Sequence, residues 1–379
     1  MTDLSKYASK WTFLFKKMAY WAWFVLAALI LLSTQFPDWL GRNYTHGFFK
    51  WLSYTLRTVS SQFPKAIGEY LYLFILIMLF INIIRQLIKY KIEYKHHLSG
   101  AKLAKKIVIN AGIFLLRFYV LFMLVWGLNY QQASPAKQFG LEVKEHYDDV
   151  VIEHFTLELI DELNAIRAQL TDSALKTVSK EQILVASIQE YEQVSAKYPF
   201  LKMQQPCLKF SRYPFIGDYL GFMAFYHPLT GEAIIRGDLP LLTLPYTTCH
   251  EIAHQLGYAS ETEANFIAFV VGAASNNKLF KYSMLLELFS YAQSAELNEI
   301  AKSGNFENWK KVIERNKKLL SPLVLSDRKK IKIFFLERRG LLIPASTSMY
   351  HQFLQWNKQA KGIQSYDDVL LWALAYRAK

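Results

Sequence analysis

The hydrophobic positions gather toward the N-terminus of the 379-residue chain, in three runs long enough to cross a bilayer. A bilayer core needs about 20 apolar residues in a helix. The first run is rich in Trp and Tyr near its start, as at a membrane interface. A signal peptide is the alternative for this run, but residues 33–37 make a poor cleavage site, so we interpret it as retained. We predict membrane spans at about 12–34, 70–88 and 107–128.

After residue 129 the hydrophobic pattern changes to that of a water-soluble domain. Apolar residues recur at helical spacing, then alternate as in strands around a turn cluster, and return to helical spacing up to the C-terminus. We therefore predict a mainly α protein, with a three-helix transmembrane region at 1–129 and a mostly helical α+β domain with a small β-hairpin or sheet at 130–379. The predicted helices are 147–170 and 180–198, the strands 207–213, 221–226 and 232–236, and the turn 227–231.

Charge gives the orientation in the membrane. Lysines near the N-terminus and the basic loop 85–106 should be cytoplasmic, because Lys and Arg favour that side. An odd number of spans then places the domain after residue 129 outside the cytoplasm, in the periplasm. The net charge of +13 lies largely beside the membrane segments, and no nucleic-acid motif occurs, so we expect a lipid bilayer partner and no nucleic acid. Nothing in the sequence specifies an oligomeric state.

His250, Glu251 and His254 form an HExxH motif. On a helix, two histidines four residues apart face the same way, and the glutamate occupies the adjoining sector. Pro245 suits a first helical turn, and Gly257 suits a left-handed stop after the last. The motif predicts Zn²⁺ bound by His250 and His254, with Glu251 as general base toward a metal-activated water. The alternative is an ordinary amphipathic helix.

A catalytic zinc usually takes three protein ligands. The next predicted helix begins at about Glu261, with Ser260 as its N-cap, and offers two acids. Glu263 also completes a capping box with Ser260, which gives it a structural role. Glu261 has no such alternative explanation, so we prefer it as the third ligand and keep Glu263 as the alternative.

Residues 261–265 resemble the second motif of gluzincin metallopeptidases, in which a ligand Glu precedes a small residue and often Asp or Asn. This resemblance implies that Glu261 is the third ligand. It also implies that Asn265 accepts a hydrogen bond from His250 or His254 and fixes the imidazole tautomer. The sequence departs from most gluzincins in its short link, because only six residues separate His254 from Glu261.

A resemblance over nearly the whole chain rests on three hydrophobic segments and four short motifs. On these features the chain is similar to a bacterial family of membrane proteins described as domain of unknown function 3810 and as zinc-metallopeptidase-like. The resemblance implies a membrane anchor, a zincin-like domain and a metal, but no substrate. The motifs are His227–Ala233, Cys249–Gly257, Glu263–Phe266 and Gly362–Tyr366.

Two further elements of a peptidase site are less specific in the sequence. Strand 221–226 or 232–236 would be the edge strand that pairs with extended substrate in zincin folds, or else both belong to a plain core hairpin. The oxyanion also needs a hydrogen-bond donor, which in gluzincins is typically a Tyr or His after the ligands. Tyr282 is our first candidate, with His227 and His351 behind it, and a buried packing role is the alternative for each.

The sequence therefore predicts a membrane-anchored zinc metallopeptidase that hydrolyses a peptide or protein substrate. The alternative is a non-proteolytic membrane protein that binds or assembles partners and keeps the fold and the metal. Intramembrane proteolysis fits poorly, because no apolar stretch of spanning length surrounds the motif. Of the two cysteines, Cys249 is expected to be a core residue and not a ligand, and a disulfide between Cys207 and Cys249 is the less favoured alternative.

Overall fold

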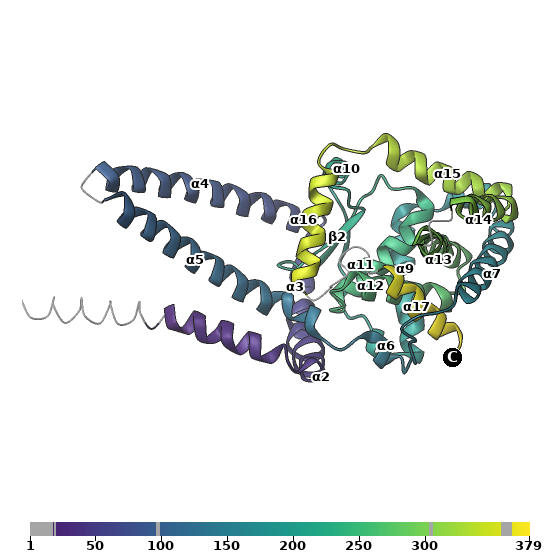
Figure 1. Cartoon of the computed structure of the whole chain (residues 1–379), viewed down its shortest axis with the longest axis horizontal. Helices are drawn as coiled ribbons and strands as arrows, with labels where there is room; N and C mark the ends of the chain where they lie inside the picture. The colour runs from purple at the N-terminus through teal and green to yellow at the C-terminus, as the bar shows by residue number, and fades with distance from the viewer. Residues whose placement is uncertain (1–17, 19, 96–98, 303–305, 358–365) are drawn as a thin grey trace, which may run out of the picture. The chain divides into compact units, whose positions relative to one another are not determined.

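The computed structural model describes most of the chain (Figure 1). Residues 303–305 and 358–365, with most of the motif Gly362–Tyr366, lie outside the described residues, as do residues 12–17 and 19 of the predicted first span. The described residues are 18, 20–95, 99–302, 306–357 and 366–379.

The chain folds as two units. Unit 1 comprises residues 1–49 and 67–132, and unit 2 comprises residues 50–66 and 133–379. The sequence-based division at 129 and 130 is contiguous, whereas the structure adds a short segment from between the membrane helices to unit 2. This segment ties the membrane region covalently to the domain at two places in the chain.

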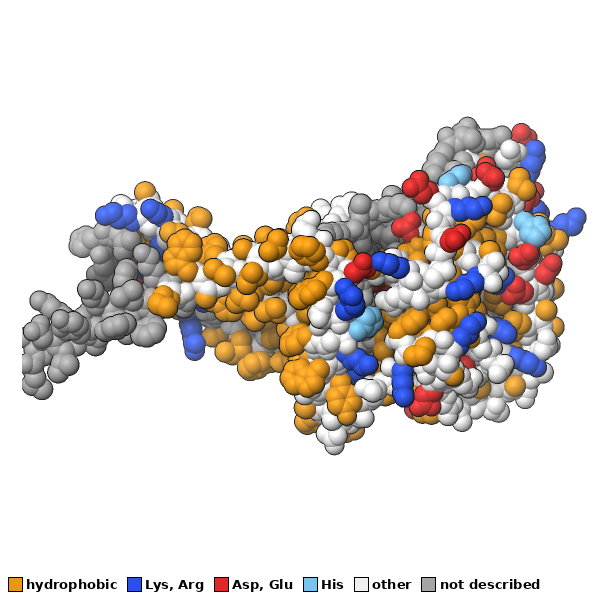
Figure 2. Space-filling view, turned by 90° about the horizontal axis from the view of Figure 1, so that it is seen from below, with side chains coloured by type: hydrophobic (Ala, Val, Ile, Leu, Met, Phe, Trp, Pro, Cys, Tyr) orange, Lys and Arg blue, Asp and Glu red, His pale blue; other side chains and the backbone are white. Residues whose placement is uncertain are grey.

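Unit 1 contains the membrane helices. Among the described residues, two helices are long and apolar enough to cross a membrane, α4 (Ile67–Lys95) and α5 (Gly100–Val125). A third candidate is the helix Tyr20–Ser33 taken together with the bent continuation Pro37–Ser60. Hydrophobic side chains cover most of the surface of the long helices (Figure 2). These findings agree with a membrane protein of two or three spans.

The segment between the first two predicted spans is largely helical. Its first part forms α2 (Pro37–Leu40) and a π-helix at Gly41–Phe49 in unit 1, and its second part forms α3 (Lys50–Ser60) in unit 2. A 3₁₀ helix at Gly127–Gln131 follows α5. The hydroxyl of Tyr44 donates to the carbonyl of Leu124 at 3.0 Å, which fixes the π-helix against the end of α5.

Unit 2 is mainly helical. The predicted helices 147–170 and 180–198 are confirmed by α7 and α9, and the chain remains helical after residue 261. The helices of unit 2 besides α3 are α6 (Pro135–Gln138), α7 (Asp149–Ala168), α8 (Asp172–Thr177), α9 (Lys180–Lys197), α10 (Phe215–Leu220), α11 (Leu244–Gln255), α12 (Glu261–Ala274), α13 (Lys278–Lys302), α14 (Phe306–Leu319), α15 (Pro322–Glu337), α16 (Ile343–Trp356) and α17 (Tyr366–Arg377), with 3₁₀ turns at Pro199–Leu201 and Leu241–Thr243.

A three-stranded sheet lies beside α11. Its strands are β1 (Leu208–Phe210), β2 (Ala224–His227) and β3 (Glu232–Ile235), in the order β1–β3–β2. Strand β3 pairs parallel with β1 and antiparallel with β2. The predicted hairpin is therefore present, with Gly231 at φ 69° in its turn. Because β3 is central, β2 is the hairpin strand that lies at the edge of the sheet.

Helix α11 lies in the middle of unit 2, against α9, α12, α13 and the strands β2 and β3. Its first turn contains Pro245, whose missing N–H is unneeded there. It ends before Gly257, whose φ of 97° is a conformation that side chains with a Cβ rarely adopt. Of the two cysteines, both buried and free, Cys249 lies on this helix. The sequence therefore predicted α11 and its boundaries almost correctly.

Helix α3 is held in unit 2 by two buried cations. The guanidinium of Arg57 donates to the carbonyls of Gln204, Gln205 and Gln255 at 2.9 to 3.0 Å, and also to its own helix neighbour Ser53. Because Gln255 ends α11, Arg57 fixes α3 to the end of the HExxH helix.

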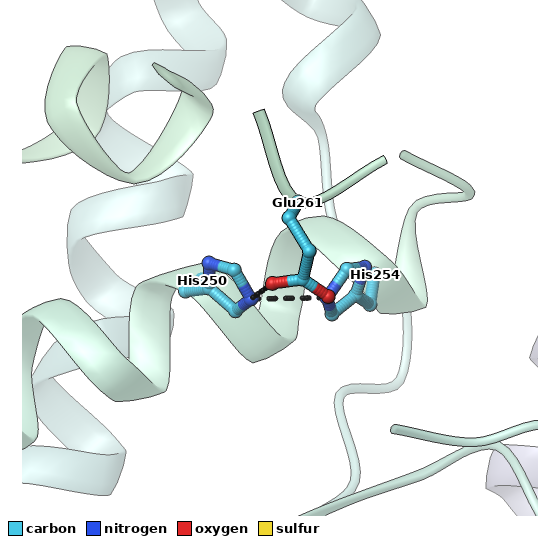
Figure 3. A group of neighbouring side chains, drawn as sticks. All are labelled: His250, His254 and Glu261. Carbon is cyan, nitrogen blue, oxygen red and sulfur yellow. Dashed lines mark hydrogen bonds and ion pairs between the residues drawn. The ribbon is translucent and has the colours of Figure 1, made fainter. Parts of the chain in front are cut away.

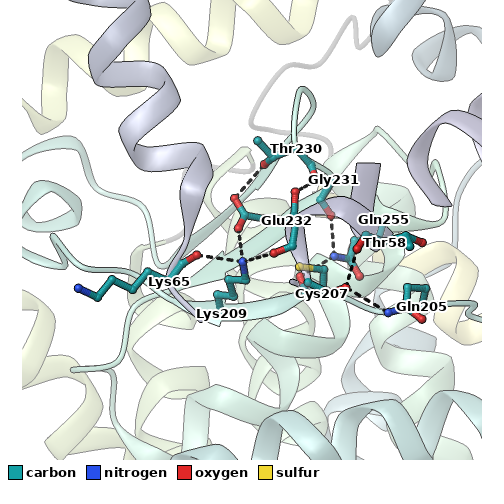
Figure 4. A network of polar contacts seen from close by, with 11 residues as sticks. Thr58, Lys65, Gln205, Cys207, Lys209, Thr230, Gly231, Glu232 and Gln255 are labelled. Atoms are coloured by element: carbon teal, nitrogen blue, oxygen red, sulfur yellow. Dashed lines mark hydrogen bonds and ion pairs between the residues drawn. The ribbon is translucent and has the colours of Figure 1, made fainter. Parts of the chain in front are cut away.

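The second cation, Lys209, lies on β1. Its ammonium donates to the carbonyls of Ser60 and Lys65 and to the carboxylate of Glu232, at 2.6 to 2.9 Å (Figure 4). The other carboxylate oxygen of Glu232 accepts from Thr230 at 2.9 Å. We call Arg57, Lys209 and these partners the α3 clamp.

Candidate metal centre

Three side chains from two helices meet at the start of α12. His250 and His254 lie on α11, and Glu261 is the first residue of α12 (Figure 3). The two imidazole Nε2 atoms are 3.0 Å apart. The carboxylate oxygens of Glu261 lie 3.2 Å from Nε2 of His250 and 3.6 Å from Nε2 of His254. We call these three residues the metal cluster.

The other ring nitrogen of each histidine is already engaged. Nδ1 of His254 lies 2.7 Å from the backbone carbonyl of Tyr258, which can only accept, so Nδ1 must donate. Nδ1 of His250 lies 2.7 Å from Oδ1 of Asn265, as the motif predicted for this asparagine. The hydroxyl of Tyr246 donates to the same oxygen at 2.7 Å. With Nδ1 protonated in both rings, the Nε2 lone pairs face each other and Glu261.

This donor set fits a zinc ion. Zinc takes His nitrogen and carboxylate oxygen at about 2.0–2.2 Å, which in a tetrahedron separates the donor atoms by about 3.3 Å. The observed separations of 3.0 to 3.6 Å bracket that value. The cluster is also accessible, because the Glu261 side chain is 25% exposed whereas His254 is 8% exposed. The residues therefore offer three ligands and an open side.

The charges of the cluster are strongly coupled. Burial raises the pKa of Glu261, but the charge of His250 and hydrogen bonds from both histidines outweigh it and hold the pKa well below its usual range. Burial lowers the pKa of His254, but the hydrogen bond to and charge of Glu261 outweigh this effect and raise it to about 9. Among the protein's own groups, a proton on the histidines balances the negative charge of Glu261. A divalent cation would take the place of that proton.

Glu251 lies on α11 next to the first histidine and is buried. Burial raises the pKa of its carboxyl, while the charges of His254 and His250 oppose the rise. Among the described residues, its Oε2 has no hydrogen-bond partner. A buried carboxylate oxygen without a donor is costly unless it receives a proton or faces a polar ligand. Glu251 is therefore suited to accept a proton near the metal cluster.

Glu263, the alternative ligand, does not join the metal cluster, which consists of His250, His254 and Glu261. The backbone N–H of Ser260 bonds to the Glu263 carboxylate, but burial outweighs this contact and raises its pKa to about 8. The Ser260 side chain makes no capping bond, so half of the predicted capping box is present. The capping role explains Glu263 without a metal.

Tyr282, predicted as the oxyanion donor, is fully buried on α13. Its hydroxyl donates to Asp327 at 2.9 Å, and Asp327 also accepts from Arg167. The hydroxyl is thus used in a packing network between α7, α13 and α15. Of the other candidates, His227 is buried on β2 and His351 lies on α16.

A tyrosine that the sequence did not single out contacts the metal cluster. The hydroxyl of Tyr350, on α16, donates to Oε1 of Glu261. Its ring stacks against Phe353, one turn later. The two bonded residues are 89 positions apart in the chain. The neighbouring His351 was a candidate, but one helix position turns a side chain by about 100°, so sequence gave no basis for choosing between them.

The comparisons with known proteins support the family resemblance over nearly the whole chain, and they do not extend to the gluzincin resemblance. Neither a curated protein nor a solved structure matches the chain. One family model, described as "Protein of unknown function (DUF3810)", matches residues 44–374, a range that includes the last two membrane helices, the α3 clamp and the metal cluster. The chain belongs to the DUF3810 family of proteins of unknown function.

Proposed function

We propose that this protein is a membrane-anchored zinc metallopeptidase with a zincin-like domain, and that His250, His254 and Glu261 hold the zinc. The observation that carries the proposal is the arrangement of the imidazoles. Both Nδ1 atoms donate to fixed acceptors, so both Nε2 lone pairs converge with a carboxylate within 3.0 to 3.6 Å. An open set of three ligands beside a buried acid is typical of catalytic zinc sites.

When bound, zinc supplies Lewis-acid chemistry that polarises a carbonyl and makes water more acidic. Glu251 is the general base in this proposal: its buried carboxylate accepts the proton of the attacking water and passes it to the leaving amine. The raised pKa of Glu251 brings the group closer to the range in which one carboxyl can accept and return a proton. Asn265 and the carbonyl of Tyr258 hold the histidines in the ligating tautomer.

Tyr350 replaces Tyr282 as the proposed donor to the oxyanion. Its hydroxyl reaches the ligand Glu261, whereas Tyr282 is bonded to Asp327. We further propose that extended substrate pairs with β2. This strand is at the edge of the sheet, and among the described strands only β3 pairs with it. Strand addition would align a peptide backbone beside α11.

We propose an extracytoplasmic location for unit 2. Residues 50–66 and 133–379 belong to the same unit, so both lie on one face of the membrane, with the α4–α5 hairpin between them. The basic residues around the tip of that hairpin, between Arg85 and Lys106, favour the cytoplasmic face. A reporter active only outside the cytoplasm should work when fused after Lys379 and fail when fused after Tyr94. The opposite pattern would place unit 2 in the cytoplasm.

The enzymatic proposal is tested with a peptide library and three variants of the full-length protein at matched zinc content. Glu251→Gln should lower turnover by about 10²- to 10⁴-fold, because a general base contributes that much. Glu263→Gln is the matched control, a buried acid outside the metal cluster, and should keep turnover. Tyr350→Phe should lower turnover without loss of zinc. Wild-type turnover in Glu251→Gln would contradict the peptidase and favour a protein that uses its metal site for binding or assembly.

A further inference from the structure

Unit 2 exposes large apolar side chains at one end. Helices α3, α10 and α16 lie at the same end, opposite α7 and α14 (Figure 1). Helices α10 and α16 are side by side: the N–H of Gly340 donates to Asp218 and the hydroxyl of Ser346 donates to Leu220, each at 2.9 Å. The exposed side chains of this end include Trp51, Tyr54, Phe215, Tyr219, Met349 and Trp356.

Helix α16 is unusual for a water-exposed helix. From Leu341 to Asn357 the sequence contains no Asp, Glu, Lys or Arg. Leu342, Met349 and Trp356 recur every seven residues and therefore share one face. Met349 is 72% exposed and Trp356 is 82% exposed, whereas Leu354 on the opposite side is buried. Contiguous apolar surface of this kind marks a protein or membrane contact in a soluble domain.

Basic residues border this surface. Arg338 and Arg339 lie just before the apolar stretch, and Arg212 lies three residues before α10. The acids nearest in sequence are Glu337 and Asp218, and Asp218 is ion-paired with Arg236. An apolar helix face with Trp and with flanking arginines is the pattern of helices that lie in the headgroup region of a bilayer.

The chain itself brings a bilayer to this end of unit 2. Helix α3 ends at Ser60 and α4 begins at Ile67. Unit 2 resumes at residue 133, after α5 ends at Val125. Connections of this length reach at most about 25 Å when fully extended. The α3 clamp fixes the first connection to β1 through Lys65, so unit 2 is tethered close to the membrane surface.

We propose that the face formed by α10 and α16 docks in the headgroup region of the bilayer that holds α4 and α5. Tyr350 of the same helix contacts Glu261, so docking places the metal cluster beside the membrane surface. The substrate class rests on the proposed function: if the metal cluster is a peptidase site, the substrates are the membrane-proximal segments of membrane proteins. The docking itself requires no catalysis.

The test places an environment-sensitive fluorophore on an introduced cysteine in the full-length protein, reconstituted in nanodiscs. Met349→Cys reports the proposed face. Val150→Cys is the matched control, because Val150 is 74% exposed and belongs to α7, which lies at the opposite end of unit 2 (Figure 1). The native Cys207 and Cys249 are buried, and labelling of the wild type measures any background.

We expect the label at position 349 to be quenched at least about twofold by lipids brominated near the headgroup and to be shielded from aqueous iodide. The label at position 150 should show the reverse. Shielding from iodide without quenching by lipid would mean that a second copy or another protein covers the face, and equal iodide quenching at both positions would mean that water does. Either result would overturn the proposal.

Two additions keep the outcome unambiguous. Trp356→Cys provides a second position on the same face if Met349→Cys does not yield folded protein. Repeating the measurement in the Glu251→Gln protein separates docking from catalysis, because that variant should show the same quenching. Loss of docking would leave cleavage of a soluble peptide intact, whereas failure of the peptidase proposal would leave the quenching pattern intact.

Discussion

The metal cluster and the α3 clamp both meet α11, and both are polar groups inside unit 2, but their donors and acceptors balance differently. In the clamp, the ammonium of Lys209 has three acceptors, and Arg57 donates to three backbone carbonyls. In the metal cluster, two imidazole lone pairs and a carboxylate face one another, and the hydroxyl of Tyr350 donates to that carboxylate. The clamp is complete as a structural element, whereas the donor atoms of the metal cluster are arranged to fit the cation that we propose there.

The largest difference is expected when a metal ligand is removed. His250→Ala or Glu261→Ala should abolish zinc binding, because two protein ligands do not complete a zinc site. Zinc per chain, measured by elemental analysis of purified protein, should fall from about one to none. Glu263→Ala is the control and should retain zinc. Full zinc in Glu261→Ala with loss in Glu263→Ala would identify the other acid as the ligand.

The clamp should respond in stability and not in zinc stoichiometry. Arg57→Met leaves three carbonyl oxygens without their donor, and each unsatisfied buried group costs about 1–3 kcal/mol. We expect the free energy of unfolding to fall by about 3 kcal/mol or more. The control is Arg42→Met, because Arg42 is exposed and donates to the backbone carbonyl of Asp38 at 3.3 Å. Zinc loss in folded Arg57→Met would show that the two regions are not independent.

The smallest expected effect concerns Asn265, which contacts His250 and is not itself a ligand in the metal cluster. Asn265→Ala removes the acceptor of His250 Nδ1–H, and loss of such a partner typically weakens metal affinity by about 10- to 100-fold. Asn265→Asp keeps an acceptor at the same place and should retain most of the affinity. Competition with a chelator measures both constants. Equal affinity in the wild type and Asn265→Ala would mean that the asparagine does not orient the ligand.

Sequence predicted what depends on local geometry. The four-residue spacing of His250 and His254 predicts their helix. Glu261 follows that helix after a short turn, and Asn265 lies one helical turn after Glu261. The structure adds what depends on packing between distant segments. Tyr350 contacts Glu261 although 89 positions separate them in the chain, and the hydroxyl of Tyr282 donates to Asp327 on α15. The hydrophobic periodicity of α13 and α16 does not show which face of each helix packs toward α12.

The membership of residues 50–66 in unit 2 was equally invisible in the sequence. Arg57 looks like an ordinary charged residue between two apolar runs, and its acceptors are backbone carbonyls, which any residue type supplies. Lys209 likewise finds two of its three acceptors in backbone groups. Hydrophobic patterning reports side-chain burial, and it carries no information about which carbonyl a buried cation will reach.

The α3 clamp has a consequence for how the protein is made. Arg57 and Gln255 are 198 residues apart, and the α4–α5 hairpin separates them in the chain. Unit 2 can therefore complete its folding only after both segments, the one before the hairpin and the one after it, are on the same face of the membrane. If only one of α4 and α5 crossed the membrane, α3 would lie on the face opposite its acceptors, and Lys209 would lose the carbonyls of Ser60 and Lys65. Correct insertion is thus a precondition for a folded domain, and a misinserted chain remains an unfolded target for quality-control proteolysis.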